Sequence, residues 1–162
     1  MKKVPNQILG IDPGVANMGI SLVQGTESPD FMDLKMTYQR HFGPDDLPPQ
    51  AATHEELLVF GSRFRDLLTE LEIDGDSHVI CERFEFRGKF TGHTIELVNL
   101  MIGIISATCP CPCRLIRPTD WKSFRKRRPD VLCALGETDH EQDATNMALY
   151  QWWQLHHRGK KR

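Results

Sequence analysis

Apolar and polar positions alternate along two neighbouring stretches near the start of the chain. Residues 8–12 (ILGID) and residues 18–23 (MGISLV) each give an extended chain an apolar face, as in a strand buried on at least one side. Pro13 and Gly14 lie between the two stretches and are typical of a turn. The pattern predicts a hairpin that presents Asp12 at the end of its first strand.

Further strands and helices follow from the periodicity of the remaining sequence. Two capping boxes, Thr53 with Glu56 and Thr138 with Glu141, predict where the first and last helices begin. A loop rich in proline and glycine is predicted over 41–52. Strands are predicted over 31–40, 78–86 and 113–118, and helices over 53 to about 74, 94–108, 119–128 and 139–157.

The composition suits a single globular domain. The chain has 162 residues, 40% hydrophobic and 26% charged, so we expect one domain over 1–162 with 158–162 as a basic tail. No apolar stretch approaches the roughly 20 residues of a membrane span, and the first residues lack the features of a signal peptide. Five cysteines without a secretion signal indicate reduced thiols. These features predict a cytoplasmic protein that does not contact membranes.

The charges are unevenly distributed along the sequence. Residues 114–162 contain 11 Lys and Arg against 6 Asp and Glu, whereas residues 1–113 contain 9 against 16. Two basic clusters, RKRR at 125–128 and RGKKR at 158–162, account for most of this excess. Such clusters often bind phosphates, although a solvated tail explains the second equally well.

Carboxylates occur at three places beside apolar segments. Asp12 ends the first strand, Glu82 lies in the strand predicted over 78–86, and Asp139, His140 and Asp143 lie in the first turns of the last helix. On a helix, His140 and Asp143 point the same way, as do Asp139 and Asp143. If this helix packs beside those strands, the carboxylates converge. Their repulsion then requires cations, and hard oxygen ligands favour Mg²⁺ or Mn²⁺ over zinc.

Each of these residues also has an ordinary structural interpretation. Asp12 in a D-P-G turn could bond its own backbone. Glu82 could form an ion pair with Arg83 or a neighbouring strand, and His140 could face solvent. The CPCPC segment, 109–113, offers three cysteines where zinc sites need four ligands, so a turn between helix and strand is favoured there over a metal site.

Three segments together resemble the RuvC family of Holliday junction resolvases, within the RNase H-like (retroviral integrase-like) nuclease superfamily. They are GIDPGVANMGISLV (10–23), VICERF (79–84) and HEQDATNMAL (140–149). In that family a D-P-G turn ends the first strand, a glutamate lies on the fourth, and the last helix carries a D-or-H-x-x-D-A motif. The resemblance covers nearly the whole chain and extends to phage-type members of the family. It implies an α/β RNase H-like fold, a five-stranded mixed sheet with strands one to three antiparallel and helices on both faces.

The resemblance also implies a function and a set of catalytic residues. It indicates a homodimeric, metal-dependent endodeoxyribonuclease of DNA recombination and repair that resolves four-way junctions by paired symmetric nicks. Two Mg²⁺ or Mn²⁺ ions per active site would support phosphodiester hydrolysis. By this analogy the catalytic and metal-binding residues are Asp12, Glu82, Asp143 and His140, with Asp139 as the rival for the fourth position. The helix over 94–108 is so apolar that a second subunit would help to cover it.

Candidate DNA contacts lie in two basic segments. Arg87 and Lys89 occupy a loop after the Glu82 strand, followed along the chain by Lys122 and the cluster 125–128, and each would make a salt-sensitive phosphate contact. The individual residues of the cluster are Arg125, Lys126, Arg127 and Arg128. Among nearby aromatics Phe90 is the better candidate for stacking at the junction crossover, whereas Phe84 and Phe86 are expected to pack in the core.

Other functions share parts of this pattern. A nuclease of the same fold that also cuts forks and flaps is scarcely separable by sequence, and a junction-binding protein without catalysis is a third interpretation. An actin-like or sugar-kinase-like ATPase opens with a similar D-x-G turn, but it needs two related domains and 162 residues supply one. The cleavage sequence, any helicase partner, and whether a virus or a bacterial cell encodes the protein are not readable. We expect the protein in the cytoplasm of a bacterium or of a phage-infected host cell.

Overall fold

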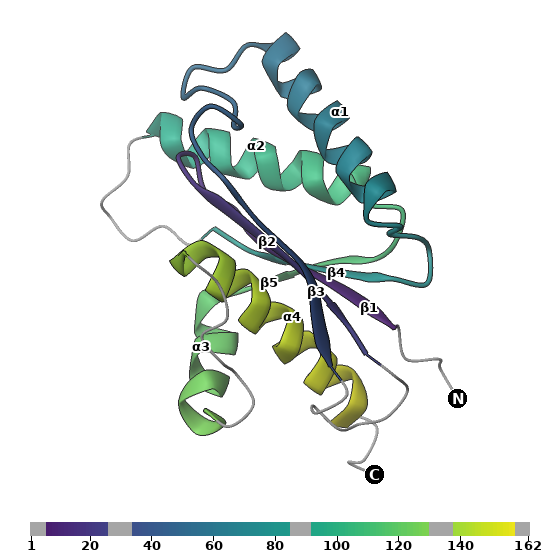
Figure 1. Cartoon of the computed structure of the whole chain (residues 1–162). Coiled ribbons are helices and arrows are strands. Elements are labelled where there is room, and N and C mark those ends of the chain that lie inside the picture. The colour runs from purple at the N-terminus through teal and green to yellow at the C-terminus, as the bar shows by residue number, and fades with distance from the viewer. Residues whose placement is uncertain (1–5, 26–33, 85–91, 130–137, 158–162) are drawn as a thin grey trace.

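The computed structural model describes residues 6–25, 34–84, 92–129 and 138–157, and its centre is one five-stranded sheet (Figure 1). Neighbouring strands follow the order β3-β2-β1-β4-β5. β2 runs antiparallel to β1 and β3, whereas β4 runs parallel to β1 and β5. This confirms the predicted mixed sheet with its first three strands antiparallel. The bounds are β1 Gln7–Asp12, β2 Met18–Gln24, β3 Lys35–Phe42, β4 His78–Glu82 and β5 Cys113–Ile116.

Helices cover both faces of this sheet, as predicted. α1 and α2 lie on one face, and α3 and α4 lie on the other (Figure 1). In the described part of the chain no helix is long and apolar enough to cross a membrane. The bounds are α1 His54–Glu70, α2 Gly92–Thr108, α3 Pro118–Arg127 and α4 Asp139–His157.

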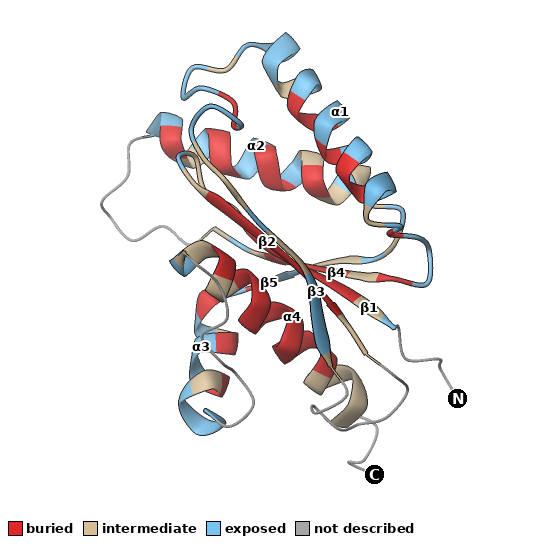
Figure 2. Ribbon diagram, viewed as in Figure 1, coloured by how far each residue is buried: buried red, intermediate tan, exposed pale blue. Residues whose placement is uncertain are grey.

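The alternation of side chains along β1 and β4 decides which face each carboxylate takes. Leu9 and Ile11 belong to the apolar core shared with α1 and α2. Ile8 and Ile80 belong to a second core shared with α3 and α4, and both cores are buried (Figure 2). Because successive residues of a strand point to opposite faces, Asp12, four residues after Ile8, and Glu82, two after Ile80, fall on the α3 and α4 face.

Two glycines allow α4 to pack directly on the strands. A Cβ at Gly10 would lie 2.0 Å from the Ala144 carbonyl oxygen, and one at Gly19 would lie 2.1 Å from the His140 carbonyl oxygen. Only a residue without a side chain permits so close a backbone approach. These contacts fix the height of the first turns of α4 above β1 and β2.

A buried polar cluster fixes the position of α4 along the sheet. Thr145 Oγ1 lies 2.8 Å from Ser21 Oγ in β2, and Gln39 Nε2 of β3 donates to the same hydroxyl over 3.1 Å. Buried hydroxyls must be hydrogen-bonded to avoid a desolvation cost. A shift of α4 along β2 would break these bonds.

Both predicted capping boxes are present. Thr53 and Glu56 bond reciprocally at the start of α1. At the start of α4, the Glu141 N–H donates to Thr138 Oγ1 over 3.3 Å and the Thr138 N–H donates to Glu141 Oε2 over 2.9 Å. The side chain of Glu141 is therefore used by the cap and turns away from its acidic neighbours.

Several predicted boundaries are wrong. The strand expected over 113–118 is β5, which ends at Ile116 because Pro118 already begins α3. α1 ends at Glu70 rather than near residue 74, because Glu72 adopts a left-handed φ of 54° and the Ile73 N–H bonds back to the Leu68 carbonyl oxygen, which closes the helix. β4 ends at Glu82, well short of residue 86. The strand expected over 31–40 is β3, which continues to Phe42 because it pairs with β2 as far as Met18.

The cysteine-proline segment is a connection, as expected. Cys109 and Cys111 lie between the end of α2 and the start of β5, which begins at Cys113. These three thiols and that of the buried Cys81 are free, and all four belong to or pack against the core under α1 and α2.

Candidate active site

Asp12 and His140 form the centre of the site. Asp12 ends β1 and is only 8% exposed. His140, in the first turn of α4, places its Nδ1 atom 2.6 Å from Asp12 Oδ2. The hydrogen bond to Asp12 raises the pKa of His140, although burial acts in the opposite direction. Asp12 is thus tied to a helix 128 residues away in sequence, rather than acting only as a turn residue.

Glu82 lies at the equivalent end of the adjacent parallel strand. Its Oε2 atom accepts a hydrogen bond of 2.8 Å from Nε1 of Trp121, a fully buried residue of α3. Burial and the neighbouring charge of Asp12 raise the pKa of Glu82 to about 7, despite the indole donor. Arg83, the partner considered from sequence, is exposed.

Asp143 is held by the helix that holds Glu82. Lys122 Nζ lies 3.4 Å from Asp143 Oδ2. Burial raises the pKa of Asp143, while Lys122 and Arg125 act to lower it. Because Trp121 and Lys122 are adjacent in α3, one turn of that helix contacts two of the three carboxylates.

The three carboxylates line one hollow. Its volume is about 440 Å³, and Glu82, Asp143 and His140 share it with Asp12 and the turn that follows β1. Asp139, the rival for the fourth position, is exposed and is not among the residues that line this hollow. The remaining lining residues are Pro13, Gly14, Val15, Ala16, Asn17, Arg83, Phe84, Thr94, Val98, Pro118 and Lys122.

The donor atoms of this hollow fit a hard divalent cation. In the described segments, no group of three or more His, Cys, Asp or Glu side chains is already arranged to hold a metal ion. The carboxylates instead contact His140, Trp121 and Lys122. However, Asp12 raises the pKa values of both Glu82 and Asp143. A cation at this place would relieve that repulsion, and carboxylate oxygens suit Mg²⁺ or Mn²⁺.

Two further residues of the site neighbourhood were not predicted. The His41 ring of β3 stacks on that of His140 with centroids 6.3 Å apart, and His41 Nε2 lies 2.9 Å from Asn17 Oδ1. Trp121 was not singled out either. No sequence spacing connects these side chains to Asp12 or Glu82, because sheet pairing and helix packing bring them together.

The predicted DNA contacts are only partly described. Arg87, Lys89, Phe90 and Phe86 lie outside the described residues. Phe84 packs against the core as expected and also lines the hollow. On α3 and just after it, Lys126, Arg127 and Arg128 are exposed, while Arg125 is half-buried.

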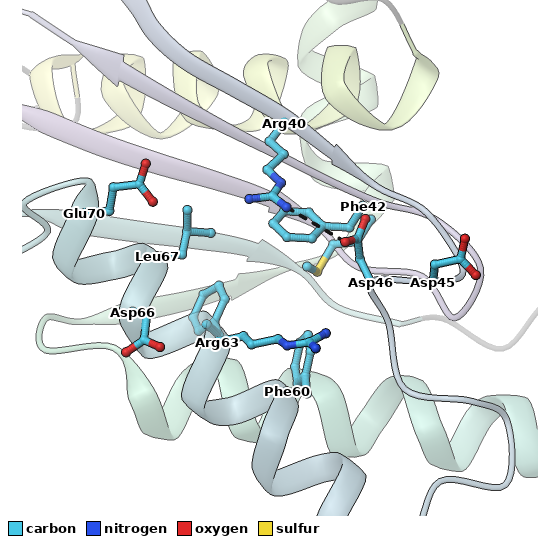
Figure 3. Close-up of a pocket in the computed structure, with 11 residues that line it drawn as sticks. Arg40, Phe42, Asp45, Asp46, Phe60, Arg63, Asp66, Leu67 and Glu70 are labelled. Carbon is cyan, nitrogen blue, oxygen red and sulfur yellow. Dashed lines mark ion pairs between the residues drawn. The ribbon is translucent and has the colours of Figure 1, made fainter.

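A second hollow of about 440 Å³ lies between α1 and β3 (Figure 3). Phe42, Phe60 and Phe64 contribute apolar surface to it. On its rim, Arg40 pairs with Asp46 over 3.9 Å, and both side chains are half-exposed. Its charged residues are exposed, whereas the carboxylates beside α3 are buried or half-buried.

Comparison with solved structures identifies the fold. The structure matches Thermus thermophilus RuvC in complex with a Holliday junction substrate at a TM-score of 0.68, over 93% of this chain and 94% of that chain, at 16% identity. The chain has the RuvC fold. No protein-family model and no curated protein matches the sequence.

One yeast structure and one viral structure share the RuvC fold with this chain. The yeast mitochondrial Holliday junction resolvase matches at a TM-score of 0.62 and 13% identity, over 94% of this chain and 81% of that chain. The fowlpox virus resolvase in complex with Holliday junction DNA matches at 0.53 and 12% identity, over 92% and 98%. The predicted fold is therefore confirmed across nearly the whole chain.

Proposed function

We propose that this protein is a structure-selective endodeoxyribonuclease that resolves four-way DNA junctions by paired symmetric nicks. The observation that carries the proposal is the convergence of Asp12, Glu82 and Asp143 in one hollow of a RuvC fold. Two of them end adjacent parallel strands and the third projects from the helix packed across those strands. This arrangement concentrates negative charge where divalent cations can offset it.

The chemistry is metal-dependent phosphodiester hydrolysis. Asp12, Glu82, Asp143 and His140 would hold two Mg²⁺ or Mn²⁺ ions, and the chemistry supplied there would be activation of a water nucleophile and stabilisation of the leaving oxygen. His140, bonded to Asp12 through one ring nitrogen, can also move protons. Lys122 supplies a positive charge beside the carboxylates and is placed to contact a phosphate.

DNA would reach the site across α3. The exposed basic residues there, with Arg87 and Lys89, would bind phosphates in a salt-dependent and sequence-independent way. Phe90 would stack at the crossover. Symmetric nicking requires two active sites, so we propose a homodimer that acts on branched DNA in the cytoplasm.

Cleavage of a labelled synthetic four-way junction tests the proposal. A fork, a flap and a linear duplex of the same sequences serve as controls, each in Mg²⁺, in Mn²⁺ and in EDTA. Paired nicks on the junction, lost in EDTA and in Asp12→Asn, are expected. Equal cutting of forks and flaps would instead indicate a debranching nuclease of the same fold. Tight junction binding without cutting would indicate a binding protein and overturn the catalytic assignment.

A further inference from the structure

Trp121 contacts two charged groups of the site at once. Its indole N–H donates to Glu82 Oε2 over 2.8 Å. The face of the same indole lies 4.8 Å from Lys122 Nζ, and Lys122 pairs with Asp143. An aromatic ring is electropositive at its edge and electronegative on its face. The electropositive edge of Trp121 therefore faces the Glu82 carboxylate, and its electronegative face lies against the Lys122 ammonium group.

The position of Trp121 is fixed independently of the site. It is fully buried in the core between the sheet and α3 and α4, and α3 begins directly after β5, with Pro118 at its start. A side chain held by packing on all sides has no rotamer freedom to lose when it donates a hydrogen bond. Glu82, by contrast, has a flexible side chain at a half-buried position in the hollow that it shares with Asp12.

We propose that Trp121 is a positioning residue that holds the Glu82 carboxylate, through its indole N–H, in the orientation that binds a divalent cation. This role rests on the proposed function and adds to it a residue outside the acidic cluster. It explains why a fully buried tryptophan and a basic residue stand side by side at the start of α3. Outer-shell donors of this kind typically change metal affinity by about 10- to 100-fold.

Calorimetric titration of Mn²⁺ into the full-length protein without DNA is the principal test. Trp121→Phe keeps the aromatic face toward Lys122 and removes the N–H. We expect an affinity roughly 10- to 100-fold weaker with unchanged stoichiometry, and a corresponding rise in the Mn²⁺ concentration that half-saturates junction cleavage. Loss of folded protein would instead lower the stoichiometry and the maximal rate, without changing the affinity.

Trp152→Phe is the matched control. Trp152 belongs to the same core and is 2% exposed, so its replacement reports the cost of removing an indole from that core. It should leave the Mn²⁺ affinity unchanged. A double-mutant cycle with Glu82→Ala completes the test, because that change removes the acceptor and in that background Trp121→Phe should have little further effect. Equal affinity in Trp121→Phe and wild type, equal weakening in Trp152→Phe, or full additivity in the cycle would overturn the role.

A second measurement needs no Trp121 variant and serves if that variant fails to fold. The indole N–H resonances of Trp121, Trp152 and Trp153 are compared by heteronuclear NMR in wild type and Glu82→Ala, which removes the acceptor. Only that of Trp121 should move strongly, and an unmoved signal would overturn the contact. A wild-type protein that neither binds Mn²⁺ nor cuts junctions would overturn the proposed function, whereas normal binding and cutting in Trp121→Phe would overturn only the positioning role.

Discussion

The pKa of Glu82 reflects the burial and the negative charge of the site. Its pKa rises from the ordinary 4.5 to about 7, first because it is buried and second because Asp12 is near. A carboxyl whose pKa is higher in the folded state binds more protons when folded, so its contribution to stability is present below its unfolded pKa and is lost as pH rises through 7. The pKa values of His140 and Asp143 are also raised.

In EDTA, wild type should therefore lose stability relative to Glu82→Gln as pH rises from about 5 to 8. The change should be at most roughly 3 kcal/mol, since each pKa unit corresponds to about 1.4 kcal/mol. Urea unfolding of both proteins at several pH values measures it. The glutamine keeps an acceptor for Trp121 but cannot ionise. A difference between the two proteins that stays constant over this range would contradict the assigned shift.

At the scale of elements, the site depends on how closely α4 approaches β1 and β2. Gly19 lies directly beneath the His140 backbone, where an added Cβ would lie 2.1 Å from the carbonyl oxygen and 2.7 Å from the Glu141 nitrogen. No backbone atom can give way by that amount without moving the helix. Since His140 and Asp143 both lie in this part of α4, the glycine sets their distance from Asp12.

Gly19→Ala should destabilise the protein by roughly 1–3 kcal/mol, the usual cost of overpacking, and should reduce junction cleavage more than the loss of folded protein explains. Thermal unfolding and cleavage rates per folded molecule measure the two effects. Gly103→Ala is the control, because Gly103 lies in α2 with no atom within 4 Å of the added Cβ. That change should be neutral or stabilising by up to about 1 kcal/mol. Equal behaviour of both variants would contradict this account.

At the scale of the whole molecule, basic charge gathers beside the candidate site on the α3 and α4 face. Lys126 and Arg127 are exposed on α3, which contacts the acidic hollow through Lys122. The opposite face, around α1, carries the exposed arginines Arg40 and Arg63 among carboxylates. Part of the charge excess of residues 114–162 thus lies on α3, the helix that contacts the carboxylates, although the net charge of the chain is −2.

Junction affinity measured against salt concentration should reveal which face binds DNA. Replacing Arg127 with Gln should weaken binding to junctions of any sequence and reduce the salt slope by about one, the value for one lost phosphate contact. Arg63→Gln removes the same charge from the α1 face and should change neither quantity. Binding in EDTA, followed by fluorescence anisotropy, separates this effect from cleavage. A larger loss in Arg63→Gln would place the DNA on the other face.

Local sequence patterns predict which segments form strands and helices and which face of the sheet each strand residue takes. Period-two alternation in residues 8–12 and 18–23 and helical periodicity in residues 57–71 and 144–155 are local properties. The capping boxes at Thr53 and Thr138 are local too, so all of these can be read without the fold. The identity of the candidate acids followed from motifs on those elements. The boundaries at Glu70 and Glu82 did not follow, because a left-handed residue and the end of a strand pair decided them.

The contacts between distant side chains, by contrast, depend on the tertiary structure. The choice of His140 over Asp139 at Asp12 depends on how α4 is seated on Gly10 and Gly19. Trp121 meets Glu82 because α3 follows β5 along the sheet, a contact between residues 39 positions apart. Such contacts leave no periodic trace in a single sequence, because packing selects them from many sterically allowed pairs. The candidate acids could therefore be predicted from the sequence, whereas their contact partners and the raised pKa of Glu82 depend on the fold.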